Sequence, residues 1–186
     1  MRITKAELYD RYYSASRNLY KEDKEMPNHC YNRVTIYNAQ DTDESREQIA
    51  KLKAIFEDEK VFGQIIPEPD WSNTPLLTSD NRWGQKYGND GELPILQTDS
   101  YGDCLRFQST GQVDDRWYDW RLQNWDTKWD AYDVTVTDDD PDQLEVTFNT
   151  AWSPPEAICN EIREQYHDLD VSWFYDEPGC EIAGYL

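Results

Sequence analysis

The sequence has little positive charge. Lysine and arginine number 18 against 38 aspartate and glutamate residues, which gives a formal net charge of −20. We expect no direct binding to DNA or RNA, because affinity for nucleic acids depends on cationic side chains that displace counterions from the phosphates. Binding to an anionic membrane is disfavoured for the same reason. The partner that suits such a chain is a basic protein surface, which the negative charge attracts at long range.

The motifs of metal, nucleotide and nucleophilic sites are missing as well. The four cysteines form no CxxC pair, so no zinc or iron–sulfur site is expected, and buried thiols in a reducing cytoplasm are favoured. No phosphate-binding GxxxxGKS, GxxxxGKT or GxGxxG motif is present. The two histidines, His29 and His167, lack a nucleophile elbow or a catalytic-cysteine context. We therefore expect no catalytic residue, no metal and no cofactor.

Long apolar runs are also absent. The chain contains no secretory signal and no stretch of about 18 apolar residues, so we expect a soluble, cytosolic protein. Its 186 residues fit a single domain. Hydrophobic residues make up 38% of the chain and aromatic residues 14%. Because each aromatic side chain buries about 150–250 Å², the core is expected to be rich in tryptophan and tyrosine.

Tryptophan is concentrated in the second half of the chain. Besides Trp173, this half contains Trp117, Trp120, Trp125, Trp129 and Trp152. We expect these side chains to pack in the core and in an insertion. A tryptophan that is exposed instead would be a candidate anchor in a protein interface.

Periodic patterns predict the order of elements after residue 26. Residues 31–37 alternate and are rich in β-branched and aromatic types, which indicates a strand. The next segment, capped by Thr42 or Asp43, indicates a helix that ends at Phe56. The later elements are strands over 131–137, 143–150, 171–175 and 180–185 and a helix capped by Ser153. This order predicts an α+β fold, a ferredoxin-like βαββαβ sandwich with an extra C-terminal strand.

Two segments lie outside that series. Residues 61–130 are rich in proline, glycine and tryptophan and predict a loop-rich insertion after the first βα unit of a single domain over 26–186. Residues 1–25 predict an added N-terminal helical extension, with an amphipathic helix over 4–21. The extension has a net charge of +1, so the rest of the chain carries −21. Its apolar stripe could pair with another copy.

Three blocks of the sequence carry a resemblance to a known family. They are MPNHCYNRVTIY at 26–37, WYDWRLQNWDTKWDAYDV at 117–134 and FNTAWSPP at 148–155, followed by an EPG turn at 177–179. In these blocks the chain resembles the YubB-like, ferredoxin-like family of phage and plasmid proteins. The resemblance implies a ferredoxin-like topology without an iron–sulfur cluster, a start equivalent to Met26, and a mobile genetic element as the source. It implies no catalytic residue.

Three of the acidic clusters in the sequence are candidates for a binding surface. They are Glu57, Asp58 and Glu59; Asp114 and Asp115; and Asp138, Asp139, Asp140 and Asp142. The third group has the spacing that opens a calcium loop, but Gln143 and Asn149 occupy the positions where glycine and glutamate are required. A solvated turn is therefore favoured over a metal site. We predict that these nine residues contribute to an acidic, partner-binding patch.

The leading hypothesis is a non-enzymatic inhibitor from a phage or plasmid. It would bind the basic surface of a host nucleic-acid-binding defence complex, such as a CRISPR effector or a restriction enzyme, in the bacterial cytosol. A continuous stripe of carboxylates could imitate duplex DNA, which carries one charge per about 1.7 Å. Two alternatives stay open: a small-ligand or divalent-metal-dependent enzyme that uses residues 61–115, and a structural module that assembles through helix 4–21.

Overall fold

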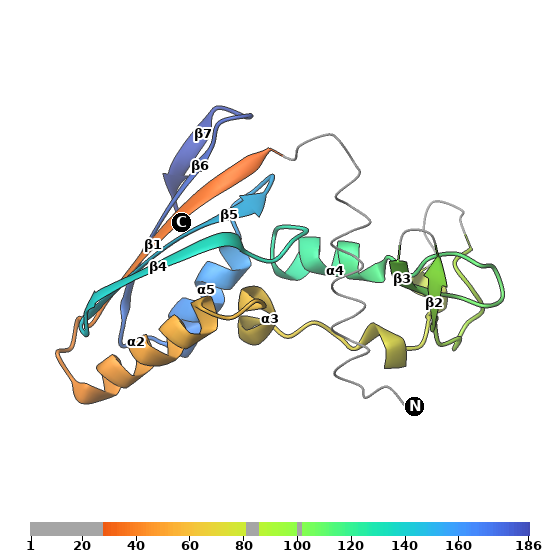
Figure 1. The fold of residues 1–186 in the computed structure, drawn as a ribbon, viewed down its shortest axis with the longest axis horizontal. Helices are drawn as coiled ribbons and strands as arrows, with labels where there is room; N and C mark the ends of the chain where they lie inside the picture. The colour runs from red at the N-terminus through yellow and green to blue at the C-terminus, as the bar shows by residue number, and fades with distance from the viewer. Residues whose placement is uncertain (1–27, 81–85, 100–101) are drawn as a thin grey trace. The chain divides into compact units, whose positions relative to one another are not determined.

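The computed structural model describes residues 28–80, 86–99 and 102–186 (Figure 1). The helix predicted over 4–21 lies outside these residues. The described chain divides into two compact units. Residues 28–68 and Tyr118–Leu186 form the first, which we call the sheet unit, and Pro69–Trp117 form the second, which we call the loop unit.

The sheet unit is built on a five-stranded antiparallel sheet. Its strands are β1 (His29–Tyr37), β4 (Tyr132–Asp140), β5 (Gln143–Ala151), β6 (Asp170–Glu177) and β7 (Ile182–Tyr185). Their order across the sheet is β4-β5-β1-β6-β7, and every neighbouring pair is antiparallel. The first strand thus lies between β5 and β6, as in a ferredoxin-like sandwich, and β7 extends one edge. The predicted fold class is confirmed.

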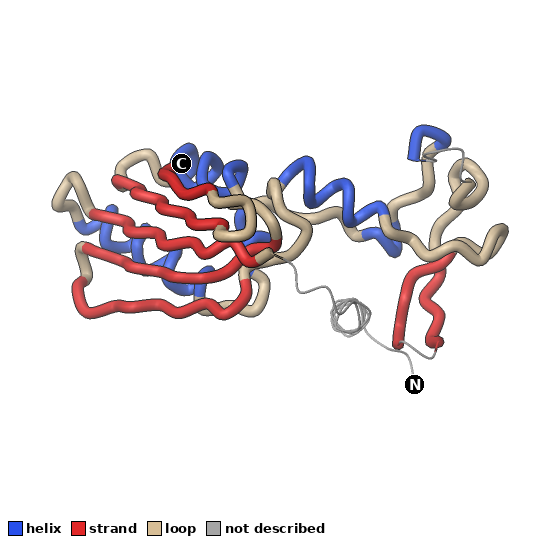
Figure 2. The backbone as a smooth tube through the Cα atoms, turned by 90° about the horizontal axis from the view of Figure 1, so that it is seen from above, coloured by secondary structure: helices blue, strands red, loops and turns tan. Residues whose placement is uncertain are grey.

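Helices α2 (Asp43–Phe56) and α5 (Glu156–Gln165) cover one face of this sheet, as Figure 1 and Figure 2 show. Side chains alternate along β1, so Val34 and Ile36 are fully buried toward the helices while Tyr31 and Tyr37 point away. The described helices include none that is both long enough and apolar enough to cross a membrane.

The two helices begin with different kinds of cap. Thr42 caps α2 as predicted, because its Oγ1 accepts a hydrogen bond from the Ser45 N–H at 3.1 Å. The prediction that Ser153 caps α5 is wrong, since α5 begins three residues later. The carboxylate of Asp126 instead accepts a hydrogen bond from the Ala157 N–H at 2.8 Å. A distant loop therefore supplies this cap.

The segment predicted as an insertion, 61–130, is divided between the two units. Helix α3 (Val61–Ile65) and most of helix α4 (Arg116–Asn124) belong to the sheet unit. Phe62 and Trp125 are fully buried in its core, with ring centroids 5.8 Å apart. The loop unit is shorter than the sequence indicated, because apolar residues at both ends of the segment pack in the main core.

The loop unit contains short elements around a small core. They are the 3-10 helices η1 (Trp71–Asn73) and η2 (Thr78–Asp80) and the paired strands β2 (Ile95–Asp99) and β3 (Gly102–Arg106). Leu76, Tyr87 and Phe107 form the core. Gly88 fits closely against it, because a Cβ atom there would lie 3.1 Å from both Leu76 Cδ2 and Phe107 Cβ.

The connection between β4 and β5 is tighter than predicted. We expected a turn over residues 138–142, but β4 continues to Asp140, and only Pro141 and Asp142 form the turn. The pairing of β4 with β5 is irregular between Thr137 and Asp140. The run of aspartates thus ends an edge strand, where charge opposes pairing with another chain.

Candidate protein-binding surface

The predicted acidic residues are divided between the two units, and those of the sheet unit lie on separate surfaces. Asp114 and Asp115 belong to the loop unit, and the others belong to the sheet unit. Within the sheet unit, Glu57 follows the C-terminal end of α2, whereas Asp142 pairs with Arg46 in the first turn of that helix. The helix rise between these two ends amounts to about 16 Å. The acidic turn and the acidic end of α2 are therefore separate surfaces.

Asp114 is buried in an ion pair. It is 1% exposed and accepts hydrogen bonds from Arg116 Nε at 2.9 Å and Nη2 at 2.8 Å. The guanidinium of Arg116 lies over the rings of Trp71 and Phe107, 5.1 and 5.3 Å from their centroids, and also donates to two backbone carbonyls. The pair holds the loop unit together. This corrects the prediction that Asp114 contacts a partner.

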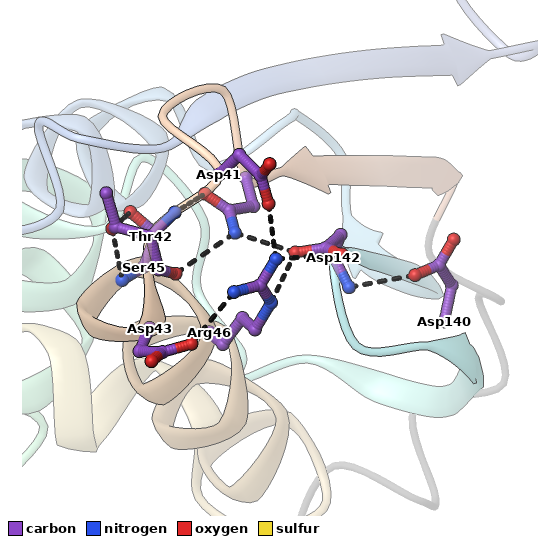
Figure 3. A network of polar contacts seen from close by, with 8 residues as sticks. Asp41, Thr42, Asp43, Ser45, Arg46, Asp140 and Asp142 are labelled. Atoms are coloured by element: carbon purple, nitrogen blue, oxygen red, sulfur yellow. Dashed lines mark hydrogen bonds and ion pairs between the residues drawn. The ribbon is translucent and has the colours of Figure 1, made fainter.

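Arg46, at the start of α2, gathers three carboxylates (Figure 3). Its Nη1 donates to Asp43 at 2.9 Å, its Nε lies 2.8 Å from an oxygen of Asp142, and its Nη2 binds Asp41. Asn38 Nδ2 also donates to Asp142, at 2.7 Å. The bond from Asn38 and the contacts with Arg46 lower the pKa of the Asp142 carboxyl. Asp142 is thus engaged in tying the β4–β5 turn to α2.

The other predicted carboxylates differ in exposure. Asp115 is half-buried, and the side chains of Asp138 and Asp139 lie outside the part of the chain that the structure describes. The exposed members of the set are Glu57, Asp58, Glu59 and Asp140. Glu57 lies 3.9 Å from Lys53 Nζ, a long surface ion pair. Such groups contribute negative charge but do not by themselves define a binding site.

The sheet face opposite the helices is the larger candidate surface, and we call it the open face. No described helix covers it (Figure 2). It consists of alternate residues of β1, from Tyr31 to Tyr37, and the residues paired with them. Tyr31 and Tyr37 are 41% and 43% exposed, and Tyr185 of β7 is 68% exposed. Exposed rings on a rigid sheet are typical anchors of protein interfaces.

The charged groups of the open face are mostly carboxylates. They are those of Asp133, Glu145, Asp170 and Asp176. Arg33 lies among them, with its guanidinium 5.5 Å from the ring centroid of Phe174. Phe174 in turn packs edge-on against Tyr185, with centroids 5.4 Å apart. The open face is therefore both aromatic and acidic.

A cluster of rings and one lysine continues the open face beyond the start of β1. His29 Nδ1 lies 2.6 Å from Tyr132 Oη, and the Tyr132 ring packs against Trp129 at a centroid distance of 6.2 Å. Burial raises the pKa of Tyr132 to about 12. Lys128 Nζ lies 4.3 Å from the Trp129 ring centroid and 5.6 Å from that of Trp152. Trp152 is 52% exposed, so the expectation that the five tryptophans all pack inside is wrong for this residue.

The segments that carry the family resemblance meet at this end of the sheet. The Trp152 N–H donates to the Asn28 carbonyl at 2.9 Å, and Asn32 Nδ2 donates to Thr150 Oγ1 at 2.9 Å. Gly179 packs so closely on Asn28 that a Cβ atom would lie 2.4 Å from Asn28 Nδ2. These contacts hold the strand ends together, and Trp152 also contributes its exposed ring to the neighbouring surface.

The described residues do not form a metal site. Within them, no group of three His, Cys, Asp or Glu side chains could hold a metal ion. An open hollow of about 710 Å³ in the loop unit is lined by residues 89–92, Gln108 and Ser109. Its Glu92 carboxylate accepts hydrogen bonds from the N–H groups of Asn89 and Ser109, which lower its pKa. Glu92 thus braces its own loop.

The four cysteines are free thiols. Cys30, Cys104 and Cys159 are buried, as expected, but Cys180 is exposed, which corrects the expectation for that residue. Burial raises the pKa of Cys30 and Cys159 to about 11. A hydrogen bond to Glu177 raises the pKa of Cys180. These three thiols are protonated at neutral pH and are poor nucleophiles.

Comparison with protein families supports the fold. A family model described as the ferredoxin-like domain in Api92-like protein matches residues 124–186, which contain β4, β5, α5, β6 and β7. The crystal structure of a protein api92 from Yersinia pseudotuberculosis aligns over 86% of this chain and 93% of its own, with 10% identity and a TM-score of 0.42. No curated protein matches the sequence. The C-terminal third of the chain is thus similar to the ferredoxin-like domain of Api92-like proteins.

Proposed function

We propose that this chain is a non-enzymatic protein that binds a basic protein surface through its open face. Its target would be a host nucleic-acid-binding defence complex, such as a CRISPR effector or a restriction enzyme, which it would inhibit. The observation that carries the proposal is a sheet face on which exposed tyrosines stand beside carboxylates. The rings supply contact area, and the carboxylates steer and match a basic partner.

Single-stranded RNA is the main competing ligand for such a face. RNA-recognition domains stack bases on aromatic side chains of a four-stranded sheet. Here the carboxylates of the open face would lie close to the phosphates of a bound strand and repel them. Counterion release also requires several lysines or arginines. Among the open-face residues of β1 and the residues paired with them, Arg33 is the one cationic side chain. Charge therefore favours a protein partner.

The resemblance to phage and plasmid proteins supports a role inside a bacterial host cell. A mobile element benefits when the nucleases that destroy its genome are blocked. The channels that hold nucleic acid in such nucleases are lined by cationic side chains, which an acidic sheet face can occupy. Inhibition would then arise because the protein and the nucleic acid compete for one channel.

The test is capture of partners by the tagged full chain from a nuclease-treated lysate of a defence-bearing bacterium, at low and moderate salt. Wild-type bait is compared with the double variant Tyr31→Ser, Tyr37→Ser, which keeps the net charge. Leu122→Ser is the matched control, because Leu122 is an exposed apolar residue of α4. We expect wild type and control to retain a basic nuclease that the double variant loses.

The captured nuclease is then assayed with and without the protein. We expect inhibition that weakens when duplex DNA or salt is added in excess. A wild-type bait that retains no basic partner at low salt, or a partner whose activity is unchanged, would refute the proposed inhibition. A partner retained equally by the double variant would show that the open face is not its binding site.

A further inference from the structure

The two exposed tyrosines of β1 each stand directly opposite an aspartate of β6. Tyr31 pairs with Asp176, and Tyr37 pairs with Asp170. Residues paired directly across antiparallel strands have Cβ atoms about 4.5–5.5 Å apart, so each ring lies next to a carboxylate. Within the described part of the chain, no hydrogen bond or ion pair engages either carboxylate. Both pairs are thus open to an external ligand.

We propose that these two tyrosine–aspartate pairs are subsites for arginine side chains of the partner, an inference that rests on the proposed function. A guanidinium on the face of a tyrosine ring gains cation–π attraction while its N–H groups bind the adjacent carboxylate. Arginine suits such a site better than lysine, because its planar group can stack and form two parallel hydrogen bonds at once.

The protein uses the same combination internally. Arg116 lies over two aromatic rings while it donates two hydrogen bonds to Asp114. Arg121 lies 4.8 Å from the ring centroid of Trp125 and donates to Glu68 at 2.7 Å. Each internal site pairs one guanidinium with a ring and a carboxylate. The open face presents the ring and the carboxylate without the guanidinium.

The spacing of the subsites restricts the partner. Tyr31 and Tyr37 are six residues apart on β1, which corresponds to about 20 Å. Between them, Arg33 lies over the ring of Phe174 and repels a third cation. The matching partner therefore presents two arginines about 20 Å apart, as in an extended segment with five residues between them or a helix with about twelve.

The test uses the isotope-labelled full chain and two peptides of identical composition. One peptide has arginine at positions 1 and 7, the other at positions 1 and 3, and glycine and serine fill the rest. The closer pair matches the subsites poorly, because its Cα atoms lie at most about 7 Å apart and its two side chains would have to extend fully in opposite directions to cover the rest of the distance. We expect the wider peptide to shift the NMR signals of Tyr31 and Tyr37 together and to bind about threefold or more tightly at low salt. A lysine version should bind more weakly.

Single variants test each subsite. Asp176→Asn and Asp170→Asn should each weaken binding of the wider peptide about two- to fivefold. Glu59→Gln is the matched control, because it removes the same charge from an exposed position after α2. Its effect should be smaller than that of either open-face variant. Equal losses of affinity in all three variants would show that the effect comes from net charge alone and would refute the two subsites.

The outcomes separate this inference from the proposed function. Equal binding of the two peptides, in a protein that still captures and inhibits a basic partner, would refute the arginine subsites alone. Failure to capture any basic partner would refute the proposed function. Shifts of the same tyrosine signals by an oligouridylate at the same concentration would overturn the inference in favour of base stacking.

Discussion

Replacing Asp130 with asparagine should remove a pH dependence of the stability of the fold. Asp130 precedes β4 and is buried, and its Oδ1 accepts hydrogen bonds from the N–H groups of Phe62 and Ala131, each at 2.8 Å. Its Oδ2 has no hydrogen-bond partner among the described residues. Burial raises the pKa of this carboxyl from 3.8 to about 6, despite the opposing hydrogen bonds and the charge of Arg121. The fold therefore favours the protonated form.

The sign of the effect follows from linkage. Because the folded-state pKa is above the unfolded value, the contribution to stability is complete below pH 3.8 and is lost as the pH rises through about 6. A shift of the Asp130 pKa from 3.8 to about 6 corresponds to a contribution of about 3 kcal/mol to the free energy of unfolding. About 2 kcal/mol of this contribution is lost between pH 4 and pH 6. An asparagine side chain at this position would keep an oxygen acceptor and carry no charge, so the Asp130→Asn variant should lack this loss.

The assay is urea unfolding followed by tryptophan fluorescence at several pH values between 4 and 7. The free energy of unfolding of Asp130→Asn, minus that of the wild type, should rise by about 2 kcal/mol over this range. Glu59→Gln controls for the loss of one negative charge at an exposed position. A difference between Asp130→Asn and wild type that stays constant with pH would show that burial does not raise this pKa.

Three further predictions concern contacts that only the structure shows. Arg116→Ala should destabilise the protein by about 3–5 kcal/mol, because the buried carboxylate of Asp114 loses its partner; thermal unfolding with no loss would contradict this role. Asp126→Ala should cost about 1 kcal/mol through loss of the α5 cap, and more than Ser153→Ala, whose hydroxyl does not cap that helix; denaturant unfolding of both variants compares them. In the folded protein, Cys180 should react with a thiol reagent well before the buried cysteines, and all four should react in urea. Fast modification of two or more thiols without urea would disagree with the described burial.

The order of elements and their type were predictable from the sequence, because they depend on local patterns. The alternation along 31–37, the cap at Thr42 and the paired runs before and after residue 140 each lie within one short segment. Segment ends were less predictable. The cap of α5 comes from Asp126, 31 residues before the N–H that it binds, and no local pattern indicates such a partner.

The candidate site depended much more on tertiary structure. The sequence by itself determined a strongly acidic, aromatic-rich ferredoxin-like chain without a recognisable catalytic motif, because composition, periodicity and motif spacing are properties of the chain. Only the tertiary structure decided which carboxylates are available to a partner. It buries Asp114 under Arg116, engages Asp142 with Arg46, and places Asp176 beside Tyr31 on an uncovered face. Burial and pairing depend on residues far apart in sequence. A run of aspartates in the sequence does not indicate which side chains the fold places next to it.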